Sequence, residues 1–269
     1  MQVPNAKRDF EQFRLRFINK IPTTFVRFSD GELEILRDNP LSIENGVVNW
    51  RLGTLDGKYP EHDNKSFVPE RDSVLRADLL SSARYKSEGY FKGVPASSNN
   101  AVIDREYMTQ LNGGPVGGLT FSDLFINENY LRFLEDILPI FLANPDVIFL
   151  ANFRADLSNL SDKWTHLPLQ DNAFPDYEEL LPGLLSKLSS VTKGSMILSS
   201  ASSISNVLGH KLHEIRPDIS FVDVGTSLNP FVGLGEATRA YQTQLLPWTL
   251  KNVSRKLKYQ LFGSHRMKW

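Results

Sequence analysis

The stretch of residues 196–222 restricts the possible folds most, because it has the pattern of a strand, a helix and a second strand. An apolar run at 196–198 leads through a serine-rich turn into a helical pattern at 203–214, and a second apolar run follows at 219–222. A tight hairpin joins antiparallel strands, whereas parallel neighbours in a sheet need a longer crossover connection, which is usually a helix. The stretch therefore predicts a parallel sheet with a helix packed on it.

The same alternation continues along most of the chain. We expect strands at 23–28, 47–52, 90–94 and 147–150, and helices at 7–20, 70–84, 128–142 and 176–190. Polar segments at 58–69 and 152–175 are expected to be irregular, as is the glycine-rich segment 112–118. The pattern predicts an α/β fold with a mostly parallel sheet flanked by helices. Because no linker interrupts it, we expect one domain over residues 1–245.

The composition excludes several classes of protein. None of the 269 residues is cysteine, which excludes disulfides, thiolate nucleophiles and cysteine-ligated metals. The P-loop, the dinucleotide-binding glycine motif and the H-E-x-x-H and G-x-S-x-G motifs are also missing from the sequence. Residues 1–20 carry charges throughout, and no apolar run approaches the about 20 residues that span a bilayer. We therefore expect a cytoplasmic protein.

The net charge of −1 is divided unevenly along the chain. Residues 251–269 contain six Lys and Arg and no acidic residue, which leaves −7 for residues 1–250. Apolar residues recur at helical spacing through 246–261, so the segment 246–269 is expected to be a basic amphipathic helix. Such a helix can pack its apolar stripe on the body, lie on an anionic membrane surface, or bind nucleic-acid phosphates.

The most informative local pattern is the strand, turn and helix at residues 25–33. The strand ends at Arg27, and Asp30 and Glu32 follow in the turn. Ligands bind at the carboxyl ends of the strands in parallel α/β sheets. Two carboxylates around Gly31 can converge on a hard cation such as Mg²⁺ or Mn²⁺, which would bridge a diphosphate. Arg27 is suited to hold a phosphate oxygen.

The same residues also have a purely structural interpretation. Ser29 and Glu32 have the spacing of a capping box, in which the two residues satisfy the backbone at a helix start. Asp30 would then only favour the helix dipole. The two interpretations are compatible, because a capping carboxylate can still face a ligand.

A second candidate cluster lies in the serine-rich turn after residue 198. Ser200 and Ser202 precede the predicted helix that contains Asn206. Hydroxyl and N–H donors at a helix N-terminus can bind a phosphate or a ribose. The alternative is that one of these serines is only the N-cap of the helix.

Residues 27–32 resemble the signature of the GT-D-type glycosyltransferases, which reads approximately Arg-Phe-Gly-Asp-Gly-Glu and contains an Asp-x-Glu metal site. Only Ser29 departs from it; the matching residues are Arg27, Phe28, Asp30, Gly31 and Glu32. The similarity continues at 127–130 and 221–231 and covers most of 20–245. It implies a Rossmann-like fold, with Asp30 and Glu32 binding the metal of a metal–nucleotide–sugar complex.

Further candidates follow the last predicted strand. Asp223 is expected at the same sheet edge, where it would orient a sugar hydroxyl or act as the general base; the alternative is a local turn toward Gly225. Arg239 lies in a glycine-containing loop from which it would reach the substrate, or it is simply solvated. Four more acidic residues are possible bases that the sequence does not rank: Asp56, Asp123, Asp171 and Glu236.

Together these features favour a metal-dependent glycosyltransferase. We expect it to move a sugar from a nucleotide-diphosphate-sugar donor to a hydroxyl of a glycan or a lipid-linked glycan, with Mn²⁺ or Mg²⁺ as cofactor. The basic segment 246–269 suggests peripheral contact with a membrane, or DNA with a hydroxylated base as the acceptor. The other hypotheses are a non-catalytic module that binds nucleotide or nucleic acid, and a metal-dependent phosphohydrolase.

Overall fold

The protein is described by a computed structural model that covers residues 4–44, 47–50, 53–56, 64–96, 100–234, 239 and 241–242. The predicted basic helix at 246–269 lies outside these residues, so it remains a prediction. Among the described residues, none of the helices is long and apolar enough to cross a bilayer.

A sheet of seven strands, all paired in parallel, forms the centre of the molecule. In spatial order its strands are β7 (Leu119–Phe121), β6 (Tyr90–Val94), β1 (Thr24–Arg27), β11 (Ser220–Asp223), β10 (Met196–Ser199), β8 (Val147–Asn152) and β9 (Thr165–Leu169). The predicted α/β fold with a parallel sheet is therefore confirmed.

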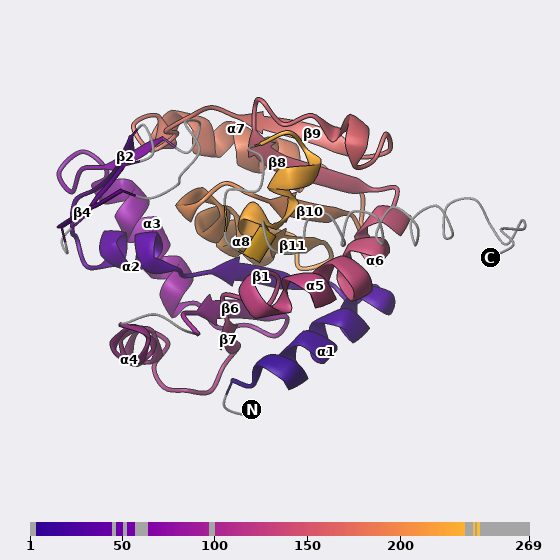
Figure 1. Cartoon of the computed structure of the whole chain (residues 1–269), viewed down its shortest axis with the longest axis horizontal. Coiled ribbons are helices and arrows are strands. Elements are labelled where there is room, and N and C mark those ends of the chain that lie inside the picture. Colours follow the sequence, from indigo (N-terminus) through magenta and orange to yellow (C-terminus); the bar gives the residue numbers. More distant parts are fainter. Residues whose placement is uncertain are drawn as a thin grey trace, which may run out of the picture.

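Both faces of this sheet are covered by helices (Figure 1). Neighbouring apolar residues on a strand point to opposite faces, so Phe25 joins one core cluster and Val26 the other. On the Phe25 face lie α1 (Ala6–Ile18), α5 (Tyr130–Arg132) and α6 (Leu138–Ala143). On the Val26 face lie α2 (Asp30–Leu36), α3 (Ser73–Arg84), α7 (Tyr177–Ser189) and α8 (Ser203–Ile215), while α4 (Ala101–Leu111) packs against α3.

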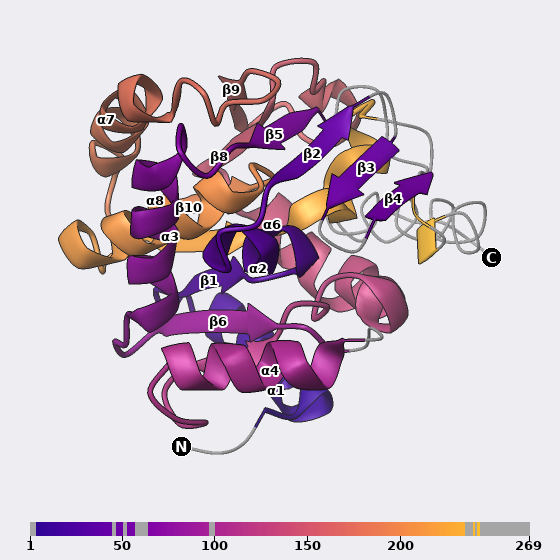
Figure 2. The same ribbon diagram turned by 90° about the vertical axis from the view of Figure 1, so that its left-hand side faces the viewer.

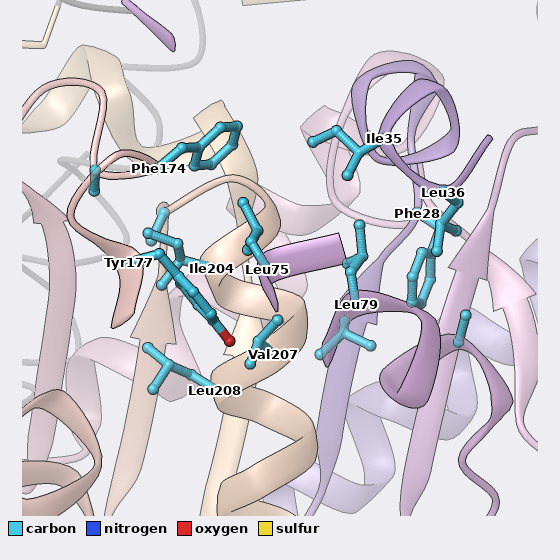
Figure 3. Close-up of a cluster of buried hydrophobic side chains, with 14 of the residues drawn as sticks. Phe28, Ile35, Leu36, Leu75, Leu79, Phe174, Tyr177, Ile204, Val207 and Leu208 are labelled. Carbon is cyan, nitrogen blue, oxygen red and sulfur yellow. The ribbon is translucent and has the colours of Figure 1, made fainter. Parts of the chain in front are cut away.

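The core on the Val26 face is made mainly by helix-to-helix packing. Leu75 and Leu79 of α3 face Ile204 and Val207 of α8, and all four side chains are buried (Figure 3). Burying a large aliphatic side chain contributes roughly 1.5–3 kcal/mol. This packing fixes the start of α8 relative to the ends of β1 and β10, where the candidate site lies.

The chain between α2 and α3 forms a second, antiparallel sheet (Figure 2). In spatial order its strands are β4 (Gly53–Asp56), β3 (Val47–Trp50), β2 (Leu41–Glu44) and β5 (Lys65–Phe67). Leu41, Ile43 and Val48 from this sheet join the core cluster of α3 and α8. Of these strands the sequence predicted only the one at 47–52.

Three sequence predictions need correction. The segment 58–69, expected to be a loop, contains β5, and the segment 152–175 contains β9, which pairs with β8 at the edge of the large sheet. The single helix expected at 128–142 is divided into a 3₁₀ turn (Asn127–Asn129), α5, a π turn (Phe133–Ile137) and α6. Pro139 has no N–H to donate to the preceding turn, which accounts for the interruption before α6. Two other 3₁₀ turns are Leu157–Asn159 and Gly225–Phe231, the latter called η4 below.

Candidate functional site

A pocket with a volume of about 460 Å³ lies at the carboxyl ends of the central strands. Each of the seven strands of the parallel sheet contributes a residue at or just after its last position: Arg27, Pro95, Ser122, Asn152, Leu169, Ser200 and Asp223. Leu41, Ile43, Val48 and Trp50 of the antiparallel sheet also line the pocket. The position is the one at which parallel α/β sheets bind ligands.

The structure brings nearly all the predicted site residues into this pocket. Those that line it are Arg27, Asp30, Gly31, Glu32, Ser200, Ser202, Asp223 and Arg239. Asn206 does not line the pocket, because its side chain is fully buried and its Nδ2 donates to the Arg27 carbonyl over 2.8 Å. In this arrangement Asn206 holds α8 to the end of β1.

Glu32 is tied into the protein by both of its carboxylate oxygens. Oε2 accepts a hydrogen bond from the Ser29 N–H over 3.0 Å, which is part of the capping box that the sequence pattern allowed. Oε1 accepts from the hydroxyls of Ser203 (3.1 Å) and Ser202 (3.4 Å). The side chain is 8% exposed and joins the start of α2 to the start of α8.

Asp30 has a different environment, although it is only two residues away. It lines the pocket and remains exposed to solvent. Desolvation raises the pKa of its carboxyl group, and the nearby carboxylates of Asp104 and Glu32 raise it further. A surplus of negative charge at this point favours a bound cation.

Asp30 and Glu32 fit a hard divalent cation in the chemistry of their donor atoms. Among the residues that the structure describes, no group of three or more His, Cys, Asp or Glu side chains is placed to hold a metal ion. A cation here would take two carboxylates from the chain and its other ligands from phosphate oxygens and water. This is the usual mode of binding for Mg²⁺ at phosphate substrates.

The start of α8 has an unusual backbone. Ser202, the N-cap residue, has φ 49° and ψ −141°, a conformation that costs free energy for a residue with a Cβ atom. Lys65 of β5 donates to the Ser202 hydroxyl over 3.2 Å. The lysine and the helix N-terminus together place positive potential at this side of the pocket, which suits a phosphate group.

Arg27 lies across the carboxyl edge of the sheet. Its Nε donates to the Ser122 carbonyl over 2.7 Å, and its Nη1 is 3.9 Å from Oδ1 of Asp223. Glycines make room for this arrangement. A Cβ atom on Gly225 would lie 1.7 Å from Nη1 of Arg27, and one on Gly93 would lie 2.7 Å from the Cα of Ser122.

Asp223 is buried at the end of β11. Its Oδ1 accepts from the Gly225 N–H over 2.8 Å, so the local turn that was the structural alternative is present. Burial raises the pKa of Asp223 to about 6, against the opposing effect of the Arg27 charge. A carboxyl group with this pKa can accept a proton at neutral pH.

Three further residues that line the pocket have a buried polar atom that is not satisfied. Within the described part of the chain, no hydrogen-bond partner reaches Nε1 of Trp50, Oδ1 of Asp123 or Oδ1 of Asn229. No sequence pattern singled out Trp50 or Asn229 as a site residue, and Asp123 was predicted only as one of four unranked acids. Desolvation raises the pKa of Asp123, while the nearby Arg27 charge lowers it.

The other unranked acids are placed differently. Asp171 lines the pocket and is bound by Arg154 and Asn152, each over 2.6 Å. Glu236 and the side chain of Asp56 lie outside the described residues.

Comparison with known proteins supports the fold of the chain. No protein-family model matches the sequence, and no curated protein is significantly similar to it. Among solved structures, the domain of unknown function 1792, described as having a distinct glycosyltransferase fold, matches with a TM-score of 0.50 and 13% identity over 82% of each chain. A DUF1792 glycosyltransferase from Streptococcus sanguinis matches with a TM-score of 0.51 and 12% identity, over 100% of this chain and 88% of the other. The chain thus has a fold similar to that of these glycosyltransferases.

Proposed function

We propose that the protein is a metal-dependent glycosyltransferase that moves a sugar from a nucleoside-diphosphate-sugar donor to an acceptor hydroxyl. One observation carries the proposal: a single pocket gathers Arg27, Asp30, Glu32 and Asp223 at the ligand-binding edge of a sheet with a glycosyltransferase fold. The resemblance of residues 27–32 to the GT-D signature supports the same function.

In this proposal the diphosphate lies between the start of α2 and the start of α8. Asp30 and Glu32 would hold Mn²⁺ or Mg²⁺, which would supply positive charge to offset that of the leaving diphosphate. Arg27 and Lys65 add positive charge from the protein, and the Ser200 hydroxyl donates to phosphate or ribose oxygens, as does the Ser202 hydroxyl when it turns away from Glu32.

Gly31 leaves space for the donor. A Cβ atom at this position would make only an ordinary contact, 3.5 Å from a methyl group of Leu41, so the protein's own packing does not require glycine. The free space is therefore consistent with a ligand passing close to the backbone.

Asp223 is the proposed proton acceptor for the attacking hydroxyl. Its raised pKa leaves it ionised at neutral pH but basic enough to take a proton. The Gly225 N–H and the Arg27 guanidinium hold it in place.

The test is a panel of nucleoside-diphosphate sugars incubated with the full chain and Mn²⁺, with release of the nucleoside diphosphate as the measurement. We expect turnover of at least one donor, its loss on chelation and its return when Mn²⁺ is added. Asp30→Ala should reduce turnover by about 100-fold or more, whereas Asp146→Asn, a change at an exposed residue outside the pocket, should not.

Two results would contradict the proposal. The first is turnover that is unaffected by chelation or by a folded Asp30→Ala variant. The second is release of inorganic phosphate from simple esters without any sugar transfer, which would indicate a phosphohydrolase.

For the acceptor we propose a glycan or a lipid-linked glycan, with the basic segment 246–269 in contact with an anionic membrane. This proposal rests on the sequence of that segment. Deleting 246–269 should abolish co-sedimentation with vesicles of anionic phospholipid but leave donor hydrolysis unchanged. Salt-sensitive binding of duplex DNA by the full chain, without vesicle binding, would favour the DNA acceptor instead.

A further inference from the structure

Asp123 is held rigidly at the end of the large sheet. It follows β7 directly, and its backbone carbonyl accepts hydrogen bonds from the Ile126 N–H and from Nδ2 of Asn129, both over 3.2 Å. Ser122, the residue before it, is fixed by Nε of Arg27. The backbone position of Asp123 is therefore set by the fold, yet the buried Oδ1 of its side chain has no donor within the described residues.

Asn229 has the same combination of a fixed backbone and an unsatisfied side chain. Its carbonyl in η4 accepts from the N–H groups of Val232 (3.2 Å) and Leu234 (3.1 Å). The residue is 5% exposed and lines the pocket, and no partner in the described part of the chain reaches its buried Oδ1. Like Asp123, it is a residue of the pocket lining with a buried acceptor atom that has no donor in the described part of the chain.

Packing between α5 and η4 joins the segments that carry these two residues. The Tyr130 hydroxyl donates to the Ser227 carbonyl over 3.0 Å, and the rings of Tyr130 and Tyr241 pack edge to face with centroids 4.9 Å apart. Leu124 and Leu228, neighbours of Asp123 and Asn229 in the chain, are buried in the same apolar cluster. The segment after β7 and η4 are thus packed together through one apolar cluster.

The local charge decides which ligand suits these two residues. Arg27 lies near the carboxylates of both Asp123 and Asp223, so a positive charge is already present. Arg27 therefore already supplies a counter-charge to these carboxylates, and what the unsatisfied oxygens lack is a hydrogen-bond donor, which a neutral hydroxyl group provides. A bound hydroxyl would also remove the cost of leaving two buried acceptors unsatisfied.

We propose that Asp123 and Asn229 form a subsite that binds hydroxyl groups of a sugar ring. The inference rests on the proposed function, under which this sugar is either the transferred sugar of the donor or the terminal sugar of the acceptor. Asp123 and Asn229 are then specificity-determining residues of the pocket, on the side away from the diphosphate.

The first experiment measures binding of free monosaccharides by saturation-transfer NMR, so that it does not depend on nucleotide or metal. The panel contains hexoses, N-acetylhexosamines and 6-deoxyhexoses. We expect at least one class to bind to the wild-type chain and to Asp30→Ala, and at least tenfold weaker binding by Asp123→Ala and by Asn229→Ala. No sugar binding by the wild type, or undiminished binding by both variants, would overturn the subsite.

The matched control is Glu128→Ala. Glu128 is exposed in the 3₁₀ turn that follows Asp123 and carries the same charge, but it does not line the pocket. Its substitution should leave sugar binding within twofold of the wild type. If Asp123→Ala fails to fold by circular dichroism, Asp123→Asn and Asn229→Ala still test the subsite.

The second experiment assigns the sugar to donor or acceptor and separates this inference from the proposed function. Calorimetry with Mn²⁺ compares the affinities of a nucleotide sugar and of the matching nucleoside diphosphate. If Asp123→Ala lowers the affinity for the nucleotide sugar at least tenfold but leaves that for the nucleoside diphosphate unchanged, the sugar belongs to the donor. An unchanged donor affinity with a raised KM for the acceptor assigns it to the acceptor. If no nucleotide sugar binds while free sugar still binds through Asp123, the proposed function fails and the subsite stands.

Discussion

Glu32 and Asp123 line one pocket, yet the protein treats these two carboxylates in opposite ways. Glu32 accepts hydrogen bonds from Ser29, Ser202 and Ser203, and these bonds join two helices. Asp123 is half-buried, and its buried Oδ1 has no donor among the described residues. The carboxylate within the recognisable sequence motif thus has a structural role already visible in the protein, whereas the one outside any motif has unused binding capacity.

The contrast extends into the motif itself. Asp30 and Glu32 are two residues apart, but Asp30 is exposed and surrounded by like charge, while Glu32 is bound on both oxygens. A motif match therefore does not reveal which of its members also holds the fold together. The predictions below test this division by stability measurements, starting with the largest expected effect.

Glu32→Ala should lower the free energy of unfolding by about 2–4 kcal/mol, because three donors lose their acceptor. Asp30→Ala should change it by less than about 0.5 kcal/mol, as is usual for an exposed side chain. Urea denaturation followed by circular dichroism measures both. Equal losses of stability in the two variants would show that Glu32 does not stabilise the fold more than Asp30 does.

Gly225→Ala tests whether the guanidinium of Arg27, which lies between the two sides of the pocket, is fixed in place. The new Cβ would be 1.7 Å from Nη1 of Arg27, and φ at this position is +51°, so we expect a loss of about 2–3 kcal/mol. Gly233 is the matched control: it has φ +70° but no atom within 4 Å of the added Cβ. Gly233→Ala should therefore cost only about 1 kcal/mol. If the two variants are equally stable, Arg27 moves aside without cost and does not fix this region.

The strands that could be predicted from the sequence are mainly those buried on both faces. β1, β10 and β11 each contain two or three consecutive apolar residues, since neighbours such as Phe25 and Val26 both face a core. β9 is an edge strand that contains Pro168 and is partly exposed, and β5 has only three residues, so neither has the apolar run that marks a strand. Their formation depends on pairing with β8 and β2, which is not local information.

The same reasoning applies to the site. Arg27, Asp30 and Asp223 could be predicted because parallel strands end at one edge, so residues just after them share a pocket. The special position of Asp123 could not be predicted, because an unsatisfied oxygen depends on what the remainder of the fold places around it. Asn206 shows the reverse case: its predicted location near the site was nearly right, but its amide is used to hold the Arg27 carbonyl.

Asp223→Asn should alter how stability depends on pH. Folding raises the pKa of Asp223 from its ordinary value of 3.8 to about 6, so the folded state binds the proton more tightly than the unfolded state. The resulting stability is fully present below pH 4 and is lost as the pH rises through 6. The free energy of unfolding of the Asn variant minus that of the wild type should therefore be about 1–3 kcal/mol larger at pH 8 than at pH 4. Urea denaturation at several pH values measures this difference, and parallel curves would contradict it.

Asp123→Asn should have the smallest effect and tests the opening comparison most directly. Oδ1 of Asp123 has no donor to lose, and burial raises the pKa of its carboxyl group, so removing the charge should change stability by no more than about 0.5 kcal/mol at pH 7. Glu32→Gln, the same chemical change, should cost about 1–2 kcal/mol, because its carboxylate oxygens accept three hydrogen bonds and an amide offers only one oxygen. If Asp123→Asn were the more destabilising of the two in urea denaturation, Asp123 would be a structural carboxylate like Glu32. Its unsatisfied oxygen would then not be reserved for a ligand.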